Sequence, residues 1–186
     1  MLFRSWRDLL SEIHSSNPEI IFLAEAFTKP VMMHTLGKVG FHQSYTYFTW
    51  RTSKAELEAY GSEVSHQTSD FFRPNFWVNT PDINPFHLQS GNQEMFALRA
   101  ILAATMSPSW GMYAGYELFE YQKFAEGGEE YLDSEKYQLK PRNWQAAEKS
   151  GKTLTPLIKK LNQIRKTNSD RKSTRLNSSH RCISYA

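Results

Sequence analysis

Two acidic residues follow short apolar stretches of this sequence, and their types and spacing point to one kind of chemistry. Glu25 comes directly after residues 20–24, and Asp82 comes just after residues 75–79 and Pro81. Two carboxyl groups that meet over one sugar are suited to glycoside chemistry, because one protonates the leaving oxygen while the other stabilises an oxocarbenium-like centre. An acid behind a strand is also often a solvated loop residue or a helix N-cap, so the spacing alone leaves both interpretations open.

Apolar segments that alternate with amphipathic ones must position these two acids. The run over residues 20–24 is apolar without alternation and too short for a buried helix, so it predicts a parallel strand covered on both faces. The expected strands are residues 20–24, 41–47, 75–79 and 110–116. The expected helices are residues 5–16, 30–36, 53–64, 93–105 and 156–166.

Capping signals mark where several of these helices begin. Ser53 followed by Glu56 is a capping box, Pro30 suits a first helical turn, and Thr155 is expected as the N-cap before Pro156. The helix over 93–105 is apolar around most of its circumference, and we expect it to be well buried; its apolar residues include Met95, Phe96, Leu98, Ile101 and Leu102. The last helix is expected to turn four residues inward: Leu157, Ile158, Leu161 and Ile164.

Four alternations of strand and helix predict an α/β fold with a parallel sheet, either a doubly wound sheet or part of an eight-stranded barrel. A barrel of about 250 residues allots about 31 to each strand-helix unit. Glu25 and Asp82 are 57 positions apart, which fits two units and places both acids at carboxyl ends of strands. We therefore expect residues 1–169 to form the second half of a (β/α)8 TIM barrel, so the chain would be a fragment of a longer protein.

Charge and cysteine content separate residues 170–186 from the rest of the chain. This tail holds four of the 22 basic residues, one of the 19 acidic residues and the single cysteine, Cys182, so the remainder is electrically balanced. A balanced body argues against nucleic-acid and anionic-membrane partners, and its lack of cysteine excludes a disulfide scaffold, a Cys-ligated zinc site and a thiol enzyme. No apolar run is long enough for a membrane span, and we expect a soluble, cytoplasmic protein.

Four ordered motifs carry a resemblance to a known family. They are IFLAEAFTKPVMMHTLGKVGF, QSYTYFTWRT, FWVNTPDI and EEYLDSEKYQLKPRNW. Together they closely resemble the maltosyltransferases that use maltose 1-phosphate, which belong to the α-amylase superfamily (glycoside hydrolase family 13). The resemblance runs from about Trp6 to Asn168, nearly the whole body. The tail instead resembles the translation of a sequencing-library adapter, with a genuine disordered tail as the alternative.

The resemblance implies roles for four residues. Glu25 matches the general acid/base, and Asp82 matches the carboxylate that stabilises the transition state. Lys136 and Tyr137 match a pair that holds the donor maltosyl unit, although without the resemblance they would be taken as a surface lysine and a packed tyrosine. The family also uses a nucleophilic Asp on the preceding strand, which no residue here matches. Pro81 stands where ordinary amylases usually carry His, which argues against a plain starch hydrolase.

The resemblance further implies the partners and the alternatives. The parent protein would be a homodimeric, retaining enzyme that transfers maltose from maltose 1-phosphate to an α-1,4-glucan, without metal or redox cofactor, and the isolated fragment would be inactive. An α-glucan hydrolase or transglycosylase and a noncatalytic carbohydrate-binding relative remain the rivals. Five aromatic residues could offer flat faces to sugar rings but are assigned no role: Tyr45, Tyr47, Trp50, Trp77 and Trp110.

Overall fold

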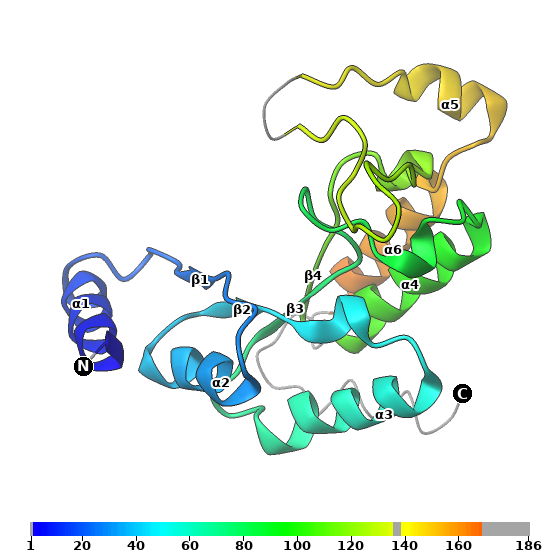
Figure 1. Cartoon of the computed structure of the whole chain (residues 1–186). Coiled ribbons are helices and arrows are strands. Elements are labelled where there is room, and N and C mark those ends of the chain that lie inside the picture. Colours follow the sequence, from blue (N-terminus) through cyan, green and yellow to red (C-terminus); the bar gives the residue numbers. More distant parts are fainter. Residues whose placement is uncertain (1, 136–138, 169–186) are drawn as a thin grey trace.

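The structure is a computed structural model that describes residues 2–135 and 139–168, and helices and strands alternate along it (Figure 1). The α-helices are α1 Leu2–Ser16, α2 Pro30–Val39, α3 Lys54–Ser62, α4 Gln93–Met106, α5 Trp144–Ser150 and α6 Thr155–Thr167. The strands are β1 Leu23–Ala24, β2 Gln43–Tyr45, β3 Pro74–Trp77 and β4 Ser109–Gly111. Short helical turns are η1 Tyr47–Trp50, η2 Glu63–Gln67, η3 Phe86–Leu88 and η4 Tyr116–Leu118.

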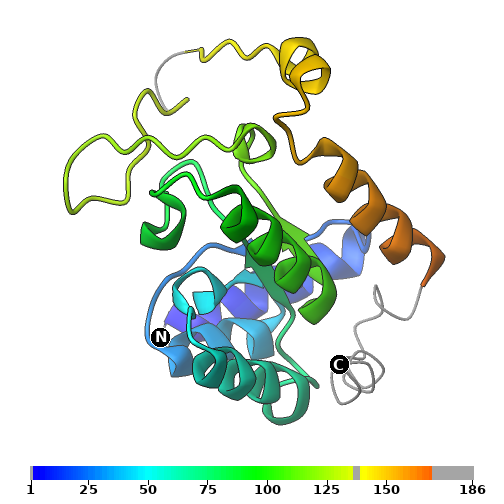
Figure 2. The ribbon, with the colours of Figure 1, turned by 90° about the vertical axis from the view of Figure 1, so that its right-hand side faces the viewer.

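The four strands form one parallel sheet in the order β1-β2-β3-β4. Helix α1 lies beside the β1 end of this sheet, whereas α4 and α6 pack together at the other end (Figures 1 and 2). A parallel sheet whose sequential strands are joined by helices confirms the predicted α/β class. Among the described residues, no helix is both long and apolar enough to cross a membrane.

The strand at the β1 edge is shorter and more open than predicted. Only Leu23 and Ala24 pair with β2, and the expectation of a strand covered on both faces is wrong. Ala24 is buried, but Leu23 is 54% exposed and Ile21 is 68% exposed. The physical reason is that β1 has a single neighbouring strand in the described part of the chain, so its outer side lacks cover.

The other strands are also shorter than predicted, and at β2 a side chain takes over the backbone groups at the strand end. In β2, the hydroxyl of Thr46 accepts a hydrogen bond from the amide of Phe48 and so caps η1, which ends the strand at Tyr45 instead of residue 47. The same hydroxyl donates to the carbonyl of Asn75 in β3 at 3.0 Å. These two hydrogen bonds fix the direction in which the chain leaves β2, next to the predicted site.

Local helix signals are confirmed at two helices and corrected at a third. The Ser53 hydroxyl accepts from the amide of Glu56, whose carboxylate accepts from the Ser53 amide, which is the predicted capping box of α3. Helix α2 begins at Pro30 as expected. Helix α6 starts one residue earlier than predicted, with Leu154 as its N-cap, because Thr155 already donates its amide to the hydroxyl of Thr153.

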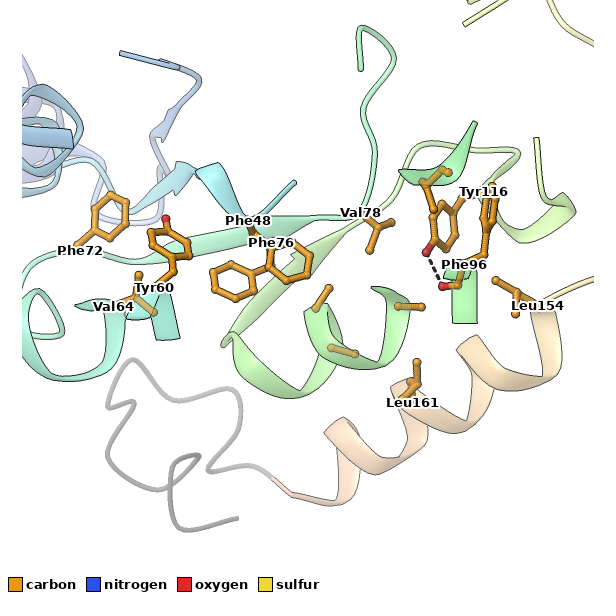
Figure 3. Packing of buried hydrophobic residues seen from close by; sticks show 14 of the residues in the cluster. Phe48, Tyr60, Val64, Phe72, Phe76, Val78, Phe96, Tyr116, Leu154 and Leu161 are labelled. Atoms are coloured by element: carbon orange, nitrogen blue, oxygen red, sulfur yellow. Dashed lines mark hydrogen bonds between the residues drawn. The ribbon is translucent and has the colours of Figure 1, made fainter. Parts of the chain in front are cut away.

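A core of aromatic and small residues supports the β3 and β4 end of the sheet (Figure 3). Phe76 of β3 lies fully buried between Phe48 and Tyr60, with ring centroids 4.4 Å and 5.9 Å away and nearly parallel planes. Farther along, the Tyr116 hydroxyl donates to the Phe96 carbonyl in the same core. Burying aromatic rings of this size contributes several kcal/mol per side chain, about 3–5 by the cost of truncating them.

The two helices behind that core are buried on one face only. In α4 the buried face is formed by Phe96, Arg99, Ala100, Ala103 and Ala104, while Leu98 and Ile101 are exposed on the outside. The expectation that α4 would be buried around most of its circumference is therefore wrong: among the described elements, α6, η3 and the sheet pack against it and leave its outer face open.

Helix α6 departs from its predicted pattern in one pair of residues. Ile164, expected to face inward, is 38% exposed, and Arg165 is buried instead. The Arg165 guanidinium donates hydrogen bonds to the carbonyls of Ala104, Ser107 and Pro108, where α4 ends. Buried carbonyls need donors, and a guanidinium supplies several at once, so Arg165 ties α6 to the α4–β4 junction.

Candidate active site

Glu25 lies directly behind β1, at the carboxyl end of the strand, as predicted. Its side chain is exposed and lines a groove of about 390 Å³ between α1, β1 and α2. Apart from Glu25 and Thr28, this groove is formed by apolar residues such as Trp6 and Phe41. A single carboxylate therefore stands at the rim of an otherwise apolar surface.

Asp82 lies at the tip of a tight turn behind β3. Thr80 and Ile83 exchange both backbone hydrogen bonds, at 3.1 Å and 3.2 Å, so Pro81 and Asp82 form the tip. Pro81 suits the first tip position because its φ angle is already fixed. The Asp82 amide also donates to the Thr80 hydroxyl at 3.2 Å, and the Asp82 side chain is left exposed.

Two buried asparagines hold this turn from both sides, and the sequence analysis did not assign them a role. Asn79 donates to the hydroxyl of Tyr131 at 2.7 Å and accepts from the amide of Tyr113 at 2.8 Å. Asn84 donates to the carbonyl of Tyr121 at 2.9 Å. The signal that could have found them is a pair of amide side chains flanking a predicted Pro-Asp turn, since asparagine commonly fixes such loops.

Tyr45 ends β2, the strand that lies between β1 and β3, behind which the two acids stand. The backbone register pairs Ala24 with Ser44, so Glu25 and Tyr45 follow at the same level of neighbouring strands. Burial raises the pKa of the Tyr45 phenol, and the negative charges of Glu25 and Asp82 raise it further. Both predicted carboxylates therefore act on the pKa of one phenol, although they follow strands on either side of it.

An aromatic cluster surrounds this phenol, formed by Phe27, Tyr45, Tyr47, Trp50 and Trp77. The Tyr45 ring lies 5.2 Å from Trp77 and 5.9 Å from Phe27, measured between centroids. Trp50 lies 5.2 Å from Phe27 and 5.9 Å from Tyr47. Four of the five aromatic residues considered in the sequence thus belong to one cluster beside the acids.

The fifth aromatic residue, Trp110, packs against the hydrophobic core and lies apart from this cluster. Neighbouring Gly111 in β4 has a specific role, because a Cβ atom there would lie 2.7 Å from the Trp77 ring. The indole of Trp77 therefore rests directly on the backbone of β4, which only glycine allows. This close approach fixes one wall of the aromatic cluster.

Two further side chains hold the cluster from a distance. The Glu129 carboxylate accepts from the Trp50 indole through both oxygens, each at 3.1 Å. Buried Arg99 of α4 donates to the carbonyls of Phe48 and Arg51 at 2.7 Å and 2.8 Å, which fixes both ends of η1. Burial lowers the pKa of Arg99 to about 10, so this guanidinium stays charged at neutral pH.

The predicted donor-binding pair, Lys136 and Tyr137, lies outside the described residues. On either side of it, the Glu135 carboxylate accepts hydrogen bonds from the Tyr113 hydroxyl at 2.7 Å and from Arg142 at 2.9 Å. These hydrogen bonds, with that from Tyr113 contributing most, lower the pKa of Glu135. Arg142 is almost fully buried and also binds Glu120, at 2.8 Å. The chain on both sides of the pair is thus anchored to the loop that follows β4.

Metal ligation has no support in residues 2–135 and 139–168, where no group of three or more His, Cys, Asp or Glu side chains could hold an ion. His14 and His42 do lie side by side, with ring centroids 4.6 Å apart. Burial and the neighbouring His14 lower the pKa of His42, and its Nδ1 accepts from the Phe22 amide. The expectation of a site without metal or cofactor stays a prediction.

A parallel sheet with acids behind two alternate strands, β1 and β3, defines an α/β protein with a candidate site for glycoside chemistry. No protein-family model matches the chain. Individual curated proteins do match it. The chain is 55% identical over 163 residues to alpha-1,4-glucan:maltose-1-phosphate maltosyltransferase 1 of Streptomyces coelicolor, 56% identical over 163 residues to the Corynebacterium glutamicum maltosyltransferase, and 52% identical over 161 residues to the Mycobacterium tuberculosis protein of that name.

These matches cover 87–88% of this chain but only 23–24% of each relative, so the chain spans about a quarter of the length of the curated relatives it matches. The resemblance carried by the four motifs is confirmed: the chain is related along most of its length to a segment of the α-1,4-glucan:maltose-1-phosphate maltosyltransferases. The relatives carry the name of a maltosyltransferase.

Proposed function

We propose that residues 1–169 are the second half of the (β/α)8 catalytic barrel of a retaining maltosyltransferase, which moves maltosyl units from maltose 1-phosphate to the non-reducing end of an α-1,4-glucan. The observation that carries this proposal is that Glu25 and Asp82 follow the carboxyl ends of β1 and β3, the two strands on either side of β2 with Tyr45. Two acids from alternate strands beside one aromatic cluster fit a sugar held between them.

Each acid has a defined task in this reaction. Glu25 in its protonated form gives its proton to the oxygen between the anomeric carbon and phosphate as that bond breaks. The resulting carboxylate then removes the proton from the acceptor hydroxyl that attacks the glycosyl-enzyme intermediate. Asp82 stays ionised and stabilises the positive charge that develops on the donor ring. The covalent bond itself forms to a nucleophilic Asp that residues 1–169 do not supply.

The open β1 edge supports the barrel assignment. Leu23 and Ile21 are exposed there, and the apolar groove beside Glu25 lies on the same side. A preceding barrel strand paired with β1 would cover these residues and would carry the nucleophile next to Glu25. Residues 170–186 are proposed to be no part of this domain, and they lie outside the described residues.

The remaining partners follow from the proposed family. Lys136 and Tyr137 would hold the donor maltosyl unit by donating to its hydroxyls, and the anchored residues Glu135 and Arg142 on either side would define where that segment starts and ends. The protein would be cytoplasmic and homodimeric, and it would need no cofactor. The isolated 186-residue chain would be inactive, because it lacks the nucleophile.

The test is a chimera in which this chain replaces the matching segment of the Streptomyces coelicolor maltosyltransferase 1. We expect phosphate release from maltose 1-phosphate only when a glucan is present. Glu25→Gln should reduce the rate by roughly 10²–10⁴-fold, the usual contribution of a general acid/base, and Asp82→Asn should also cause a large loss. Glu58→Gln, an exposed α3 residue paired with Lys54, is the matched control and should leave the rate unchanged.

Two results would contradict the proposal. A folded chimera that keeps its rate after Glu25→Gln would remove Glu25 from the reaction. Glucose oligomers released from starch without maltose 1-phosphate would favour a hydrolase instead.

A further inference from the structure

Tyr45 differs from four other tyrosines of the fold in its hydroxyl group. The hydroxyls of Tyr47, Tyr113, Tyr116 and Tyr131 each bond to a protein group: a carbonyl, a carboxylate, a second carbonyl and an amide respectively. Within the described residues, the half-buried Tyr45 has no hydrogen-bond partner for its hydroxyl. This hydroxyl is not among the buried polar atoms that lack a partner, so it reaches solvent and is open to a bound ligand.

The ring of Tyr45 is nevertheless held firmly in place. Phe27, two residues after Glu25, meets it edge-on at 5.9 Å, and Trp77 lies against it at 5.2 Å. The Trp77 ring already packs against the backbone of Gly111, so it cannot move toward β4 and away from Tyr45. A fixed ring with an unpartnered hydroxyl is the arrangement expected of a preorganised binding group.

We propose that the Tyr45 hydroxyl contacts the substrate, donating a hydrogen bond to an oxygen of the sugar that lies between Glu25 and Asp82. This assignment rests on the proposed function and adds to the site a polar group from β2, the strand between those that carry the two acids.

The Tyr45 phenol can donate a hydrogen bond because it keeps its proton. Burial, and then the charges of Glu25 and Asp82, raise its pKa above the ordinary value of a tyrosine. The phenol is therefore protonated at neutral pH, and its proton is not released during the reaction. A neutral O–H beside two carboxylates complements a sugar, whose hydroxyls both accept and donate: they accept from Tyr45 and donate to the carboxylate.

The experiment compares two tyrosine-to-phenylalanine changes in the chimera. Tyr45→Phe keeps the packed ring and removes only the unpartnered hydroxyl, so we expect kcat/KM for maltose 1-phosphate to fall about 10-fold, as for one lost hydrogen bond of about 1.4 kcal/mol, with an unchanged urea midpoint. Tyr60→Phe removes the hydroxyl of a core tyrosine that is 6% exposed and whose ring stacks on Phe76. It should lower the urea midpoint and leave kcat/KM unchanged.

The outcomes separate this inference from the function on which it rests. If Glu25→Gln abolishes transfer while Tyr45→Phe keeps kcat/KM within twofold, the Tyr45 assignment is wrong and the proposed function stands. If Glu25→Gln has no effect, the function itself fails. Maltose binding to the chimera, followed by calorimetry, gives a second measurement that needs no turnover: Tyr45→Phe should weaken it, and unchanged affinity would overturn the inference.

Discussion

The two ends of the sheet hold the two predicted acids in very different ways. Asp82 stands on a turn pinned by buried Asn79 and Asn84, behind a strand whose core residue Phe76 is fully enclosed. Glu25 stands behind a two-residue strand with exposed Leu23 on one side and an apolar groove on the other. The chain therefore determines the position of Asp82 by its own packing, whereas Glu25 lies at an edge strand beside a groove between α1 and α2.

The two acids therefore differ in how much of their surroundings the chain itself packs. Burial of apolar side chains is the main source of stability in a domain of this size. In this chain the buried apolar cluster is concentrated under β3 and β4. The β1 end offers apolar surface of its own but covers little of it. Substitutions at the two ends should accordingly differ in their effect on the free energy of unfolding.

The largest effect is expected at the center of the well-packed end. Phe76→Ala removes a ring stacked between Phe48 and Tyr60 and should lower the free energy of unfolding of the 186-residue chain by about 3–5 kcal/mol, measured by urea denaturation. A loss below 1 kcal/mol would mean that this region is not the core on which the chain depends.

A smaller loss is expected where α6 joins the end of α4. Arg165→Met keeps the length of the side chain but removes the donors to the carbonyls of Ala104, Ser107 and Pro108, and should cost about 1–3 kcal/mol. Lys166→Met, an exposed neighbour on the same helix, is the control and should be nearly neutral. Equal effects of the two substitutions would argue that Arg165 is not buried.

The capping box of α3 should contribute less again. Ser53→Ala removes the hydroxyl that accepts from the Glu56 amide and should cost about 1 kcal/mol by the same urea measurement. Ser53→Asp keeps an accepting oxygen and should recover most of that loss. A loss that Asp cannot recover would show that Ser53 acts in some other way.

The smallest effect is expected at the open edge. Leu23→Ala should change the free energy of unfolding by less than about 0.5 kcal/mol, because more than half of the side chain is already exposed. Val78→Ala, just behind β3 and fully buried, is the matched apolar substitution and should cost clearly more. Equal losses would contradict the claim that the β3 and β4 end of the sheet is more tightly packed than the β1 end.

Features encoded by a few neighbouring residues could be predicted from the sequence. The capping box at Ser53, the start of α2 at Pro30 and the order of strands and helices follow from short patterns and from periodicity. The positions of Glu25 and Asp82 behind alternate strands belong to the same class, because they depend only on counting strand-helix units.

Features that depend on contacts between distant segments could not be predicted. Arg165 sits among charged residues of an amphipathic helix and looks solvated, and its three carbonyl partners meet it only after α4 and α6 have packed. The same holds for Tyr45, which looks like any strand aromatic until Phe27 and Trp77 enclose it. The early end of β2 could not be predicted because it depends on a single hydroxyl, that of Thr46, which caps η1 and directs the chain out of the sheet.

The most direct test asks whether Glu25 and Asp82 converge on one point. The pKa of the Tyr45 phenol can be followed by NMR in the 186-residue chain with ¹³C-labelled tyrosine, using Tyr45→Phe to assign the signal. A nearby negative charge opposes loss of the phenol proton, so Glu25→Gln and Asp82→Asn should each lower this pKa, and the double variant should lower it further. A pKa that responds to only one of the two substitutions, or to neither, would contradict a shared site.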